Sequence, residues 1–108
     1  MINKIFVHDQ SDIEEIKFDI LNRELTMKIL KYNESSDSDE EYIVCFDAVS
    51  NVEMFNVEYL QQHELTVSHC EYTEGDERNR IKLILLQGFG MTDFEIGFEF
   101  STIRYVID

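Results

Sequence analysis

Few side chains in this sequence are of a type and spacing that could catalyse a reaction or bind a metal. His8 and Asp9 are adjacent and precede the first strand-like segment. Such a pair can bind metal when further His and Asp residues complete the site. The other histidines, His63 and His69, show no helical metal-ligand spacing with it. We therefore expect His8 and Asp9 to make hydrogen bonds in a turn, with a metal or catalytic role as the alternative.

The two cysteines, Cys45 and Cys70, lie in apolar segments of strand length, where a free thiol behaves as a small hydrophobic side chain. His69 and Cys70 are neighbours, so on a strand their side chains point to opposite faces and form no dyad. A Cys45–His69 dyad would require their two strands to pair. No C-x-x-C or H-x-x-x-H spacing indicates zinc. We expect no catalytic residue, no metal and no cofactor.

Acidic side chains are the dominant chemical feature. The 108 residues hold 9 Lys and Arg against 23 Asp and Glu, which gives a formal net charge of −14. Residues 33–77 contain thirteen acids and no Lys or Arg, so nearly all of the excess lies there. Nucleic-acid and anionic membrane surfaces are recognised through Lys and Arg, so neither is expected as a partner.

The densest part of this charge is the segment 33–41, which has no apolar residue and predicts an exposed acidic loop. It lacks the glycine and the terminal glutamate spacing of an EF-hand loop. A solvated loop and a docking surface for a basic partner both fit its composition. Several tyrosines accompany the acids, and tyrosine is enriched at interfaces. The candidate partner-binding residues are Glu34, Asp37, Asp39, Glu40, Glu41, Tyr42, Asp47, Glu53, Glu58 and Tyr59.

The elements that must position these side chains are strands, because apolar and polar residues alternate along most of the chain. We see no linker and no internal repeat. The pattern predicts a single mainly-β domain over 1–108, an antiparallel sheet, barrel or two-layer sandwich of seven or eight short strands with at most one short helix. The predicted strands are 13–20, 24–32, 42–46, 49–55, 65–72, 81–86, 94–100 and 103–107.

The stretch 50–62 fits two kinds of element. Ser50-x-x-Glu53 matches a helical capping box. Val52 and Phe55 favour a strand instead, and we favour a strand for 49–55.

Four segments together resemble a known group of small bacterial proteins. They are His8-Asp9 with Ile13 and Ile16, Glu24-Leu25-Thr26-Met27, Tyr42-Ile43-Val44-Cys45-Phe46 with Val49, and Phe94-Glu95-Ile96-Gly97-Phe98-Glu99-Phe100. Their order is similar to that of predicted immunity proteins of polymorphic toxin systems, above all the family called immunity protein fifty. The resemblance implies a cytoplasmic protein that binds and blocks a cognate toxin and has no reaction of its own.

These observations favour a small, acidic, non-catalytic binding protein. The leading hypothesis is an immunity-type inhibitor of a basic toxin such as a nuclease, whose cationic substrate site an acidic surface can occupy. One alternative is a homo-oligomeric assembly module joined through a sheet edge. Another is a β-barrel that binds a small ligand in its interior. The sequence has no run of about 20 apolar residues and no signal-peptide-like start, so a cytoplasmic location is expected.

Overall fold

The computed structural model describes residues 2–55, 65–87 and 93–107, most of which belong to one antiparallel sheet. A four-residue helix, α1 (Ile2–Ile5), precedes the strands. The order of strands across the sheet is β4-β7-β6-β5-β1-β2-β3-β8, so the predicted mainly-β fold is confirmed. No helix among the described residues is long and apolar enough to cross a membrane. The strands are β1 (Ser11–Asp19), β2 (Glu24–Asn33), β3 (Ser38–Asp47), β4 (Ser50–Phe55), β5 (Leu65–Thr73), β6 (Asn79–Leu86), β7 (Phe94–Phe100) and β8 (Thr102–Ile107).

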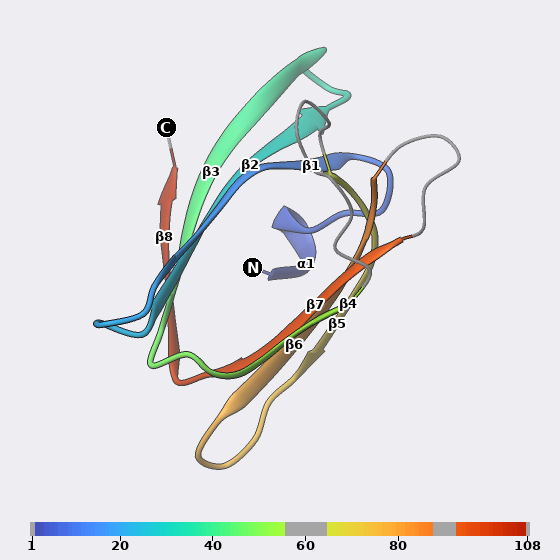
Figure 1. Ribbon diagram of the computed structural model, residues 1–108. Coiled ribbons are helices and arrows are strands. Elements are labelled where there is room, and N and C mark those ends of the chain that lie inside the picture. The colour runs from blue at the N-terminus through green and yellow to red at the C-terminus, as the bar shows by residue number, and fades with distance from the viewer. Residues whose placement is uncertain (1, 56–64, 88–92, 108) are drawn as a thin grey trace.

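The sheet curves until its two halves face each other, with α1 in the mouth between them (Figure 1). One half contains β8, β3, β2 and β1, and the other contains β5, β6, β7 and β4. The halves are joined by a narrow pairing of β1 with β5, at Asp12–Thr66 and Ile13–Leu65. β4 and β8 form the two ends of the sheet, so the architecture is an open, flattened barrel.

Side chains from both halves fill the interior. The ring of Phe46 on β3 meets the rings of Phe98 and Phe100 on β7 edge-on, at centroid distances of 4.8 and 4.9 Å. Such aromatic contacts add to the free energy of apolar burial. Helix α1 contributes Ile5, and Phe6 follows it into the same core. The described interior is therefore packed, which gives no support to a ligand site inside the barrel.

The β2–β3 hairpin of one half and the β6–β7 hairpin of the other share the same pairing register at an offset of 54 residues. Met27 pairs with Val44 and Ile29 with Tyr42 between β2 and β3. Adding 54 to each number gives Ile81–Phe98 and Leu83–Ile96, which are pairs between β6 and β7. β1 and β5 each carry a bulge, at Ile13/Glu15 and at Val67/His69, but their registers against β2 and β6 differ by two residues. The repeat lies in register and burial rather than in residue identity, which is why the sequence does not display it.

The ambiguous stretch begins as a strand. β4 covers Ser50–Phe55 and pairs with β7, which confirms the strand prediction for this part. A register shift between Ser50 and Glu53 interrupts its alternation, and Asn51 adopts a φ of 51° there. Residues 56–64 lie outside the described part of the chain.

Candidate functional site

The acidic tip, which we define as residues 32–41, is the end of the β2–β3 hairpin and lies at the top of the view in Figure 1. The sequence predicted a loop over 33–41, but both strands extend into this segment and only 34–37 form the turn. Asp37 closes the turn with a φ of 50°, a left-handed conformation that Asp tolerates better than most residues. The side chain of Asn33 accepts a hydrogen bond from the Ser35 amide at 2.9 Å. The acids are therefore held on a formed hairpin.

Three carboxylates of the acidic tip form no ion pair with any cationic group in the described part of the chain. Glu34, Asp37 and Asp39 are exposed, and none of the ion pairs among the described residues includes them. Glu41 differs, because its Oε1 lies 3.6 Å from Nζ of Lys28. Uncompensated charges of one sign at a protruding end produce a local negative potential.

Glu40 and Tyr42 support the acidic tip from its inner side. The Tyr42 hydroxyl donates to Oε2 of Glu40 at 2.9 Å, and the Asn33 amide donates to Oε1 at 2.6 Å. Both hydrogen bonds hold the pKa of Glu40 below its usual value. Tyr42 itself is only 8% exposed, with its ring in the core. Its assignment as a partner-binding anchor is corrected, because Tyr42 shares the inward face of β3 with Val44.

Tyr32 is the tyrosine that the acidic tip exposes. It is 40% exposed, and its hydroxyl donates to Oδ1 of Asp37 at 2.5 Å. This hydrogen bond is the main cause that raises the pKa of Tyr32, followed by burial and by the charges of Glu34 and Asp39. The exposure of Tyr32 could have been predicted from the sequence. Side chains alternate along a strand, so Tyr32 lies on the same outward face of β2 as Lys28, opposite to the inward Met27 and Ile29.

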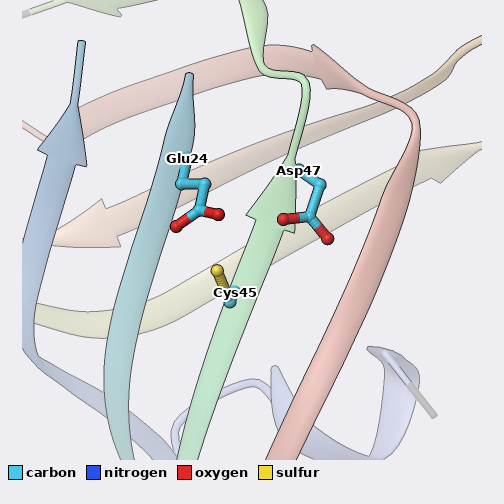
Figure 2. Close-up of side chains that lie close together, drawn as sticks. All are labelled: Glu24, Cys45 and Asp47. Carbon is cyan, nitrogen blue, oxygen red and sulfur yellow. The ribbon is translucent and has the colours of Figure 1, made fainter. Parts of the chain in front are cut away.

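Glu24, Cys45 and Asp47 form a second cluster, at the other end of β3 (Figure 2). One ligand atom from each lies within 4.8 Å of the others, a spacing that could hold a metal ion. The Arg104 guanidinium of β8 already occupies this position: it donates to Asp47 at 2.9 and 3.0 Å and contacts Cys45 Sγ at 3.0 Å and Glu24 Oε1 at 3.3 Å. Hydrogen bonds from Arg104 lower the pKa of Asp47, and Asp47 in turn raises that of Arg104.

The Arg104 contacts give this cluster a structural role. They fasten the terminal strand β8 to β3 and β2 by a charge-assisted, two-pronged hydrogen bond to Asp47. Asp47 was predicted as part of the partner-binding surface. It is instead engaged within the protein, and it lies at the opposite end of β3 from the acidic tip.

Glu53 lies on the other half of the sheet. Its Oε2 is 3.4 Å from Nη2 of Arg80, beside a surface hollow of about 230 Å³ between β4, β7 and β6. Gly97 forms part of this hollow, and a Cβ there would lie 3.2 Å from Arg80 Nη2. Glu58 and Tyr59 lie outside the described residues. Of the ten predicted residues, the structure gathers five at the acidic tip: Glu34, Asp37, Asp39, Glu40 and Glu41.

His8 and Asp9 lie in a turn, but their hydrogen bonds to the backbone reach β5 rather than the turn itself. Nδ1 of His8 lies 2.7 Å from the Ser68 carbonyl, and Nε2 lies 3.0 Å from Oδ2 of Asp9. The Asp9 amide donates to the Val67 carbonyl at 2.9 Å, and Asp9 has a φ of 60°. These contacts join the segment after α1 to β5.

The cysteines do not form the dyad considered from the sequence. Cys45 is on β3 and His69 is on β5, and two strands, β1 and β2, lie between them in the sheet. Cys70 faces the core side of β5, where burial raises the pKa of its thiol to about 11. The Cys70 thiol is therefore protonated at neutral pH and a poor nucleophile.

Comparison with known proteins adds no assignment. No family model, curated protein or solved structure matches the chain. The resemblance to immunity proteins thus rests on the four sequence segments, and the candidate site rests on the geometry of the acidic tip.

Proposed function

We propose that this chain is a non-catalytic binding protein whose acidic tip docks on a basic surface of a partner protein. The observation that carries the proposal is the set of three exposed carboxylates on a formed hairpin, Glu34, Asp37 and Asp39, which form no ion pair within the described part of the chain. A hairpin end presents such groups to a concave cationic site more readily than a flat sheet face does. The exposed ring of Tyr32 supplies a contact that is not purely electrostatic.

Charge at the acidic tip acts mainly on specificity and on the rate of association. At physiological ionic strength, charges are screened over about 8 Å, so neighbouring carboxylates on one turn act together. A complementary positive patch is then attracted before contact, and anionic partners are repelled. Affinity depends on the buried contacts that follow.

The finer proposal is an immunity-type inhibitor that acts in the cytoplasm on a basic toxin. The acidic tip suits the substrate site of a nuclease, which is built to receive phosphates. Two free cysteines are compatible with a reducing compartment. Co-expression with the toxin domain encoded by an adjacent gene tests this proposal. Restored growth is expected, and continued killing by a toxin that this chain fails to bind would contradict it.

The docking surface is tested with a synthetic Lys/Arg-rich peptide, followed by backbone amide shifts of the protein. The charge-reversal variant is Glu34→Lys/Asp37→Lys/Asp39→Lys. The matched control, Asp76→Lys/Glu77→Lys/Asp93→Lys, also reverses three exposed acids that form no ion pair among the described residues, and so changes the net charge equally. We expect amide shifts centred on the acidic tip. The charge-reversal variant should bind the peptide at least tenfold more weakly than the control variant does. Equal losses would show that net charge alone attracts the peptide.

Assembly through a sheet end is a second candidate, favoured by one observation. On the end strand β4, Met54 is 44% and Phe55 is 53% exposed. A chain that pairs through this edge should sediment as a dimer at micromolar concentration, and Phe55→Lys should make it monomeric. A monomer at all concentrations would remove this candidate.

A further inference from the structure

A hollow of about 430 Å³ is lined by residues of α1, the end of β5 and β8. Figure 1 shows the position of α1 between the two halves of the sheet. This volume is within the range of about 300–1,000 Å³ typical of ligand pockets. Its walls are Ile2, Asn3, Tyr72, Glu74, Ile103 and Tyr105. The hollow borders the packed core, because Ile2 belongs to the core and Tyr72, Ile103 and Tyr105 pack against it. None of its lining residues belongs to the acidic tip.

The chemistry of the walls is aromatic and acidic. Tyr72 and Tyr105 provide two phenol rings, Glu74 provides an exposed carboxylate, and none of the lining residues is basic. Tyr72 is held in place because its ring stacks on Phe100 at a centroid distance of 6.1 Å and an interplanar angle of 28°. Burial, then the charge of Glu74 and a hydrogen bond to it, raise the pKa of Tyr72, so its hydroxyl stays neutral.

The internal repeat shows that the fold does not require these polar groups. On β5, Tyr72 pairs with Ile81, and the first-half counterpart of Ile81, Met27, pairs with Ile16 of β1. Ile16 and Phe18 therefore hold the positions equivalent to Tyr72 and Glu74. The corresponding corner of the first half is therefore apolar where this one carries a phenol and a carboxylate. A purely structural corner could be built from either set.

We propose that this hollow binds a cationic side chain, specifically an arginine, of a protein partner. An arginine guanidinium stacks on aromatic rings and pairs with a carboxylate, and the hollow presents both. The net charge of −14 attracts basic proteins and thereby favours this occupant over an anionic or neutral one. The inference rests on the proposed function for the kind of partner, but it concerns a different surface from the acidic tip.

The test uses the intact protein and Nα-acetyl-arginine amide as the probe. The neutral isostere Nα-acetyl-citrulline amide is the control ligand, and ring and amide resonances of the protein are the readout. We expect saturable shifts at Tyr72, Glu74 and Tyr105, with a dissociation constant on the order of millimolar, as a single side chain allows. Binding of the citrulline probe should be at least fivefold weaker. Shifts that do not saturate, or equal binding of both probes, would overturn the inference.

Two variants locate the binding within the hollow. Glu74→Gln keeps the shape of the side chain and should weaken the arginine probe several-fold, whereas the neighbouring Glu77→Gln should not. Tyr105→Leu should also weaken binding of the arginine probe several-fold. A thermal melt of this variant reports whether the fold is retained. If both variants bind the probe as well as the parent protein does, the assignment is wrong.

The charge-reversed tip separates this inference from the proposed function. Glu34→Lys/Asp37→Lys/Asp39→Lys should leave binding of the arginine probe within twofold of the parent value. Loss of probe binding in that variant would overturn the pocket assignment. Loss of peptide docking at the tip with retained probe binding at the hollow is the result expected if both proposals hold.

Discussion

The two halves of the molecule differ in character at the ends of the β2–β3 and β6–β7 hairpins. In the first half, Lys31 and Glu40 form a cross-strand pair on the inner face of β2 and β3. Their equivalents 54 residues later are Leu85 and Phe94, which pair in the same way between β6 and β7. Leu85 and Phe94 are 0% and 2% exposed, whereas Lys31 and Glu40 are only half-buried. One register thus carries an apolar pair in one half and a charged pair in the other.

This difference indicates which parts of the fold are structural and which are free for another role. In the β6–β7 hairpin, the Leu85–Phe94 pair is still buried in the core, so its side chains contribute to stability. In the β2–β3 hairpin, the equivalent Lys31–Glu40 pair is only half-buried, and the strands beyond it form the acidic tip. A segment that the core does not need can carry carboxylates outside any ion pair, and the acidic tip carries three that form none with the described residues.

Truncating the side chains at two equivalent positions, Phe94 and Glu40, gives the largest expected difference in stability. Phe94→Ala should lower the free energy of unfolding by about 3–5 kcal/mol, because it leaves a cavity in a packed core. Glu40→Ala should have a much smaller effect, since that side chain makes hydrogen bonds only at the edge of the core. Urea unfolding of the two variants measures both changes. Similar losses would show that the acidic tip is as much a part of the core as its counterpart.

Alkylation distinguishes the cysteine of each half. Cys70 should react with iodoacetamide far more slowly than Cys45 at pH 8, because burial keeps its pKa near 11 and almost no thiolate is present. Its reaction rate should rise tenfold for each pH unit up to about 10 while the fold persists. Mass spectrometry of peptides after timed labelling measures both rates. A plateau in the Cys70 rate below pH 9 would contradict the assignment.

The ion pair between Arg104 on the end strand β8 and Asp47 should make a small, pH-dependent contribution to stability. The pKa of Asp47 is lower in the folded protein than its ordinary value of about 3.9. Its contribution to stability is therefore present above pH 4 and is lost as the pH falls through the folded pKa. Arg104→Met should lower the melting temperature slightly at pH 7.

The matched variant Asp47→Asn isolates the carboxylate. In the Asp47→Asn background, the effect of Arg104→Met should shrink. In the parent protein, the same effect should be smaller at pH 2.5 than at pH 7. Circular dichroism melts at the two pH values measure these differences. An Arg104→Met effect that is unchanged at pH 2.5 would show that packing, rather than the ion pair, holds β8.

The sequence predicted what local patterns determine and missed what distant contacts determine. Alternation located the strands, and the run of acids located the tip. The engagement of Asp47 depends on Arg104, 57 residues later, so no local pattern shows it. The inward position of Tyr42 follows from strand parity and was available in the sequence. The 54-residue repeat is visible only in register, because positions such as Glu40 and Phe94 hold side chains of opposite character.

The rate of association with a basic partner, measured against ionic strength, tests the central claim most directly. Stopped-flow binding of the Lys/Arg-rich peptide should be fast at low salt and slow steeply as salt is added. The Glu34→Lys/Asp37→Lys/Asp39→Lys variant should lose most of this salt dependence, while Asp76→Lys/Glu77→Lys/Asp93→Lys should retain it. Equal slopes for the two variants would contradict the acidic tip as the docking surface.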